Sequence, residues 1–315
     1  MEKKKFDNYI ITGFDGGSFF SVAVLFNLLL TLVFAVALQL TGATDNESFM
    51  SSYAYTFMGF LVSPVAIGGC MLYAKLKGKL NLCLSVGFCK FDIKYLGITL
   101  LLFVGCVFGL SGLNTVFVDW LNKLMGYKAQ PINLPGSGFG NFLLCTLIVC
   151  VVPAITEESL FRGVVLNGAK RLGDVFAALV CGGLFCLYHH SPQQTIYQFI
   201  LGALFALLAV KSGSIYPSVI FHFLNNFYII VGYFIWGESL SLPTVWNVII
   251  VIVGLVVLAL GIFLLIKAKK CEREEKIKAD FLKVAELKSE RKAFLISSLT
   301  GTVVCAILWL VELFS

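Results

Sequence analysis

The sequence predicts an all-α fold, a polytopic transmembrane helical bundle of about eight to nine spans. Of the 315 residues, 58% are hydrophobic and 13% are charged, whereas soluble proteins have about 45–50% apolar and about 25% charged residues. Mean hydropathy is +0.90. The apolar residues form continuous runs near the roughly 20 residues that a spanning helix needs, without the alternation of a membrane β-barrel. These observations exclude a soluble enzyme, a disordered protein and a secreted disulfide scaffold.

Nine apolar runs are the candidate spans. They cover residues 18–40, 53–74, 95–117, 140–166, 174–191, 194–210, 214–236, 245–266 and 293–314. The weakest candidates are 194–210, because it is short, and 140–166, because it is long and contains charges. Pro153 in that long run predicts a kinked helix, since proline has no N–H for the helical ladder.

The spans fall into three regions. We expect N-terminal spans and loops over 1–135, a central helical core over 136–236, and C-terminal spans over 237–315. The charged loop 267–292 has apolar residues at helical spacing, which predicts an amphipathic helix on the membrane surface. A regulatory partner site is the alternative interpretation of that loop.

The distribution of basic residues predicts the orientation. If the N-terminus is inside and nine spans alternate, 22 of the 24 lysines and arginines lie inside, and only Lys123 and Lys128 lie outside. Positive charge accumulates on the cytoplasmic side of membrane proteins. We therefore expect a multi-pass protein of the cell membrane with a cytoplasmic N-terminus. The net charge of +6 then marks a membrane face, so the lipid bilayer is an expected partner and nucleic acid is not.

A few ionisable side chains lie inside or at the ends of apolar runs. They are the adjacent Glu157 and Glu158 and the histidines His189, His190 and His222. Placing a charged group at the centre of a span costs about 2.5–3.5 kcal/mol on insertion scales, so such groups are functional candidates. The scarce polar chemistry of the chain is concentrated in three nearby helices.

Helix geometry orders these residues. Glu158 and Arg162 are four residues apart and can pair, whereas Glu157 points about 100° away from Glu158. At about 1.5 Å per residue, Glu157 lies roughly 20 Å from Lys170. The same count puts His189 roughly 22 Å from Asp174, and His222 roughly 16 Å from Lys211. The similar depths predict one shared cluster.

A glutamate, two histidines and an amide suit hydrolysis by an activated water. A carboxylate in apolar surroundings is a competent general base, and a histidine can orient the water or bind a metal. A second histidine and the amide of Asn226 can donate to an oxyanion. The sequence has neither a G-x-S-x-G elbow nor an H-E-x-x-H helix, so serine-hydrolase and zincin mechanisms lack their motifs.

Three motifs resemble the CPBP intramembrane protease family, which includes the type II CAAX prenyl endopeptidases and the Abi proteins. The motifs are Glu157-Glu158-x-x-x-Arg162, Phe185-x-x-x-His189 and His222-x-x-x-Asn226, within residues 140–230. The resemblance implies that Glu157 activates water, that His189 helps to hold it, and that His222 and Asn226 stabilise the oxyanion. Glu158 and Arg162 would support the site, and Phe185 would shape the pocket.

Metal dependence, substrate and activity class stay open at this point. Glu157, His189 and His222 could hold zinc, although not in a recognised zinc spacing, and we favour a glutamate base without a metal. The expected partner is a peptide or protein at the membrane, reaching the site from the bilayer or the cytoplasm. Peptide maturation or self-immunity fits better than a prenylated CAAX substrate. The rival functions are a proton-coupled transporter and a non-catalytic bacteriocin-immunity protein.

Overall fold

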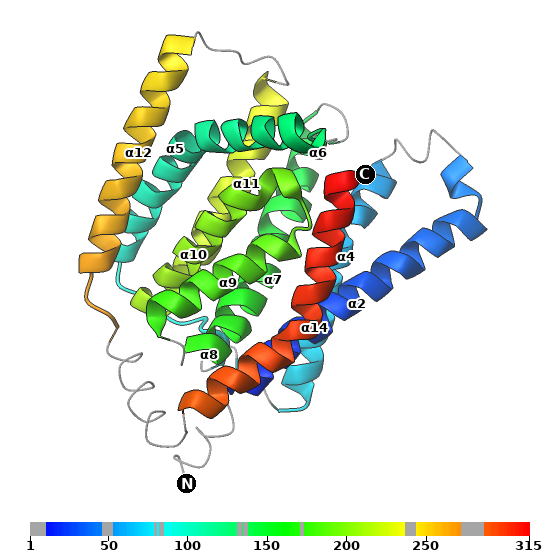
Figure 1. Ribbon diagram of the computed structural model, residues 1–315, viewed down its shortest axis with the longest axis horizontal. Coiled ribbons are helices and arrows are strands. Elements are labelled where there is room, and N and C mark those ends of the chain that lie inside the picture. Colours follow the sequence, from blue (N-terminus) through cyan, green and yellow to red (C-terminus); the bar gives the residue numbers. More distant parts are fainter. Residues whose placement is uncertain are drawn as a thin grey trace.

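The computed structural model is a bundle of long helices (Figure 1). It describes residues 11–45, 53–78, 81, 85–130, 134, 138–170, 173–236, 244–271 and 287–315. Within these residues there is no strand, and eight helices are long and apolar enough to cross a membrane. The predicted all-α polytopic bundle is confirmed, and the chain is a multi-pass membrane protein. The charged segment 272–286, which holds most of the predicted surface helix, lies outside the described residues.

The helices make up most of the described residues. In chain order they are α2 (Gly13–Leu40), α4 (Tyr53–Leu76), α5 (Lys94–Met125), a rod formed by α6 (Phe139–Cys145), η3 (Thr146–Val151), α7 (Val152–Glu158), η4 (Ser159–Val165) and α8 (Leu166–Ala169), then α9 (Asp174–Tyr188), η6 (Pro192–Gln194), α10 (Thr195–Ser212), α11 (Tyr216–Trp236), α12 (Thr244–Lys267) and α14 (Leu287–Phe314). The weak candidate at 194–210 is one of the eight spans, inside Pro192–Ser212.

One predicted span is shorter than expected. The run 174–191 becomes α9, which has 15 residues and ends at Tyr188. At 1.5 Å per residue it is roughly 22 Å long, less than the hydrocarbon core of about 30 Å. Ser191 is extended and Pro192 starts the next turn, so the chain reverses here. His189 therefore lies at the tip of a hairpin between α9 and α10.

Three helix pairs pack through glycine: α5 with α12, α2 with α14, and α9 with α10. A Cβ on Gly109 of α5 would lie 2.8 Å from the Gly254 carbonyl carbon of α12. A Cβ on Gly182 of α9 would lie 2.8 Å from the Phe199 carbonyl oxygen. Small residues let transmembrane backbones approach closely, and van der Waals contact then stabilises the pair.

The α6–α8 rod lies at the centre of these pairs, and Phe161 shows how it is held. This side chain is fully buried. Its ring makes edge contacts with Phe20 of α2 at 6.1 Å and with Phe185 of α9 at 5.1 Å between centroids. The rod thus carries the two glutamates through a buried part of the bundle.

The rod contains two π-helical turns, η3 and η4, on either side of α7. Pro153 lies at the start of α7, and its missing N–H cannot serve the carbonyl of Val149 four residues earlier. The helix before Pro153 thus widens into a π-helical turn, and the predicted kink stays a prediction. Single π-helical turns are frequent at functional sites, and here they flank Glu157 and Glu158.

Helix α5 bends, and its second half passes over the bundle toward α6 (Figure 1). The Ser111 hydroxyl donates to the Phe108 carbonyl at 3.2 Å, and the Thr115 hydroxyl donates to the Ser111 carbonyl at 3.1 Å. Serine and threonine that bond back to the preceding turn often bend helices. The bend carries the stretch from Ser111 to Asp119 across one end of a large cavity, which these residues help to line.

Candidate active site

Glu157 lies between two imidazole rings. Its Oε2 atom is 4.0 Å from Nε2 of His189 and 4.0 Å from Nε2 of His222. The Glu157 residue is only 9% exposed, and Oε2 is buried without a hydrogen-bond partner among the described residues. The structure thus brings together the three side chains that the sequence placed at similar depth.

Hydrogen bonds of the two Nδ1 atoms orient the His189 and His222 rings toward Glu157. Nδ1 of His189 lies 2.8 Å from the Phe185 carbonyl, and Nδ1 of His222 lies 3.0 Å from Oε1 of Glu158. A carbonyl or a carboxylate only accepts, so each Nδ1 carries the proton. In the neutral rings, both Nε2 atoms then present a lone pair toward Glu157.

Glu158 contacts both Arg162 and His222. Its Oε1 accepts from Nη1 of Arg162 at 2.7 Å, and both side chains are fully buried. The Arg162 guanidinium also donates to the Gly202 carbonyl at 3.0 Å and lies 4.4 Å from the Phe185 ring centroid. The expected Glu158–Arg162 pair is present, and the same carboxylate oxygen fixes His222, a contact that the spacing did not indicate.

The end of α9 is held from two other helices. The Tyr188 hydroxyl accepts from Nδ2 of Asn27 at 3.1 Å and lies 2.9 Å from the Ser63 hydroxyl. The next residue, His189, stacks edge-on against Phe185 with centroids 4.6 Å apart. These contacts explain how a residue at a hairpin tip is kept in place. Phe185 is a buried packing residue, as expected.

His190 takes no part in the cluster. It adopts a left-handed backbone conformation with φ of 51°. His189 is among the described residues that line the cavity, and His190 is not. Of the two adjacent imidazoles, His189 is therefore the one that faces Glu157.

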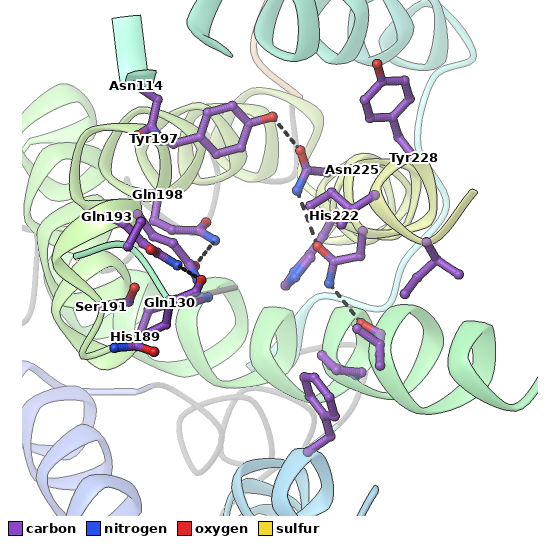
Figure 2. Close-up of a pocket in the computed structure, with 18 of the residues that line it drawn as sticks. Asn114, Gln130, His189, Ser191, Gln193, Tyr197, Gln198, His222, Asn225 and Tyr228 are labelled. Atoms are coloured by element: carbon purple, nitrogen blue, oxygen red, sulfur yellow. Dashed lines mark hydrogen bonds between the residues drawn. The ribbon is translucent and has the colours of Figure 1, made fainter. Parts of the chain in front are cut away.

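Asn226 belongs to a directed chain of hydrogen bonds (Figure 2). The Tyr197 hydroxyl donates to Oδ1 of Asn225 at 2.6 Å, and Nδ2 of Asn225 donates to Oδ1 of Asn226 at 3.3 Å. Nδ2 of Asn226 donates to the Val149 carbonyl at 3.0 Å, the carbonyl that Pro153 cannot serve. This leaves Asn226 one N–H for a ligand.

Tyr197 and Asn225 are site residues that the sequence did not reveal. Asn225 had no assigned role, and Tyr197 lies on α10, which carries no motif residue. Packing of α10 against α11 brings Tyr197 to Asn225, which precedes Asn226 on α11. No spacing within one helix could have signalled this contact.

A cavity of about 990 Å³ contains Glu157, His189, His222 and Asn226. Figure 2 shows labelled lining residues, including His189 and Gln198 on one side and His222 and Asn225 on the other. The exposed residues that line the cavity are Gly59, Ser111, Thr115, Asp119, Ala129, Gln130, Tyr228 and Ile229. All of these lie in the half of the bundle that holds the α5–α6 connection. The cavity therefore opens there, away from the lysines near the opposite helix ends, such as Lys94 and Lys211.

The spacing of Glu157, His189 and His222 differs from that of a zinc site. Ligands about 2.0–2.1 Å from a tetrahedral zinc lie about 3.3–3.4 Å from one another, whereas Glu157 Oε2 is 4.0 Å from each histidine Nε2. Among the described residues, no group of three histidine, cysteine or acidic side chains is placed to hold a metal. The possible zinc set of Glu157, His189 and His222 does not fit zinc as these side chains stand.

Comparison with known proteins agrees with the motifs. Residues 139–228 match the family model described as type II CAAX prenyl endopeptidase Rce1-like. No curated protein and no solved structure matches the chain. The matched segment runs from α6 into α11 and includes Glu157, His189, His222 and Asn226. This match supports the resemblance of residues 139–228 to the CPBP family and its type II CAAX prenyl endopeptidases.

Proposed function

We propose that the chain is an intramembrane endopeptidase in which Glu157 activates water. The observation that carries the proposal is the unpartnered Oε2 of Glu157, which lies 4.0 Å from two histidine nitrogens at the inner end of a cavity. A water within about 2.8 Å of Oε2 also fits within reach of Nε2 of His189. The site thus has room for the nucleophile next to its base.

In the proposed reaction, Glu157 takes a proton from this water while the oxygen bonds to the peptide carbonyl carbon. The free N–H of Asn226 donates to the resulting oxyanion. His222 can also donate once both of its nitrogens are protonated, with Glu158 beside Nδ1 as the counter-charge. The proton on Glu157 passes to the leaving nitrogen as the C–N bond breaks. No covalent intermediate and no metal step is required.

The site residues have distinct proposed roles. Glu157, His189, His222 and Asn226 are the catalytic residues. Glu158 and Arg162 support His222, and Phe185 packs against His189 and Arg162. The proposed substrate is a peptide or protein segment at the membrane. The protein lies in the cell membrane with its N-terminus in the cytoplasm.

Cleavage of a peptide library by the protein in lipid nanodiscs tests the proposal. Glu157→Gln keeps the size of the side chain and should abolish cleavage. His189→Asn should lower kcat by about 10²-fold, in the range of general acid–base contributions. His190→Asn is the matched control, because asparagine tolerates a left-handed backbone and His190 does not line the cavity. Cleavage that survives Glu157→Gln, or equal losses at His189 and His190, would contradict the site. Proton-coupled uptake without cleavage would favour a transporter.

A further inference from the structure

The cavity lining has acidic groups and no basic ones. Among the described residues that line it, Glu157 and Asp119 carry carboxylates, and none is a lysine or an arginine. The histidines present lone pairs from Nε2. The electrostatic character of the cavity is therefore negative from its inner end to its opening.

The neutral polar side chains that line the cavity also present hydrogen-bond acceptors to it. Nε2 of Gln193 donates to the Gln130 carbonyl at 3.1 Å, which orients the amide and leaves Oε1 buried without a partner. Oδ1 of Asn114 is also buried and unpartnered. Buried acceptors left unpaired cost about 1–3 kcal/mol each. A ligand that brings N–H groups would remove that cost.

Asp119 is the charged group nearest the opening. It lies in the bent half of α5 and is exposed, and it forms no ion pair with any residue that the structure describes. Lys123 follows one turn later but does not line the cavity. An unpaired carboxylate beside apolar walls attracts a cation more strongly than one in bulk water.

We propose that the substrate is an extended peptide segment with a lysine or arginine side chain, which reaches Asp119 when the scissile carbonyl lies at Glu157. This inference rests on the proposed function and specifies its substrate. The backbone N–H groups of the segment donate to Gln193 and Asn114. A cavity of about 990 Å³ is at the upper end of the roughly 300–1,000 Å³ of ligand pockets and accommodates several residues in extended form.

The test uses peptide pairs that differ at one position. Each peptide is acetylated at its N-terminus. The two peptides of a pair carry lysine or glutamine at the same position, and this position differs from one pair to the next. The full chain in nanodiscs should cleave the best lysine peptide with a kcat/KM about tenfold above its glutamine partner. Asp119→Asn should remove that preference, and Asp119→Lys should shift it to the matching glutamate peptide. Glu312→Gln is the control, because Glu312 is an acid near the end of α14 that does not line the cavity.

Binding separates this inference from the proposed function. Fluorescence anisotropy with the Glu157→Gln protein measures affinity without turnover. If no peptide is cleaved but lysine peptides bind more tightly through Asp119, the peptidase proposal fails, and only the recognition of a basic side chain by Asp119 is supported. If lysine and glutamine peptides bind and react equally, or if the preference survives Asp119→Asn, the inference is overturned.

Discussion

Asn226 donates to the carbonyl of Val149 at 3.0 Å, where the helix lacks the N–H of Pro153. One side chain thus satisfies a helix carbonyl and keeps its second N–H free for the proposed oxyanion. Pro153→Ala supplies the missing donor and removes part of the roughly 3 kcal/mol that an interior proline costs a helix. We expect a higher melting temperature and a kcat lowered by about tenfold, because Val149 no longer holds the Asn226 amide. Calorimetry and peptide kinetics in detergent measure both quantities. A higher kcat would show that the Val149 contact does not orient Asn226.

Tyr197 sets the orientation of the two asparagines through its hydroxyl. Tyr197→Phe removes that donor and lets the Asn225 amide turn. We expect kcat to fall by about tenfold with little change in KM, because the oxyanion donor is misplaced while the cavity keeps its shape. Tyr228→Phe is the matched control: Tyr228 lines the same cavity and packs edge-on against Phe108 at 6.0 Å. Equal effects of the two substitutions would refute the orienting role of Tyr197.

The Glu158–Arg162 pair should be sensitive to the loss of either partner. Both side chains are fully buried, and removing one partner of a buried pair costs about 3–5 kcal/mol because the other charge is left uncompensated. We expect Arg162→Leu to lower the unfolding free energy by that amount. The double variant Glu158→Leu with Arg162→Leu should be more stable than Arg162→Leu alone. Denaturation in mixed micelles tests both, and additive losses would argue against a coupled pair.

Metal removal should leave activity unchanged. The histidine-to-glutamate distances of 4.0 Å are longer than tetrahedral zinc ligation needs. We expect full peptide cleavage after incubation with phenanthroline and no stoichiometric zinc by elemental analysis. Loss of activity on chelation, with recovery when zinc is added back, would show that the three side chains move inward to bind a metal.

The sequence predicts the parts of this site that depend on one helix at a time. Glu158 and Arg162 pair because four residues bring side chains to one helical face, and depth along three helices groups Glu157 with His189 and His222. The contact of His222 with Glu158, and that of Tyr197 with Asn225, depend on helix rotation and interhelical packing. Neither leaves a periodic signal in a single sequence.

In the fold, too, features set by the local sequence are predicted and features set by packing and chain reversal are not. Continuous apolar runs predict the spans, but the shorter α9 depends on where the chain reverses at Ser191 and Pro192. The π-helical turns on either side of α7 leave no signal in the apolar pattern. The bend of α5 rests on hydroxyl contacts that many straight helices also contain. Hydropathy alone does not distinguish these cases.

The one-sided cavity has a consequence for the permeability of the membrane. Beyond Glu157, away from the opening, the bundle is filled by Glu158 and Arg162 and by the buried rings of Phe161, Phe185 and Phe205. Water that enters from the open end meets this plug before it can cross. If the proposed hydrolysis takes place here, the site takes up water without opening a path for ions, so the membrane potential is preserved.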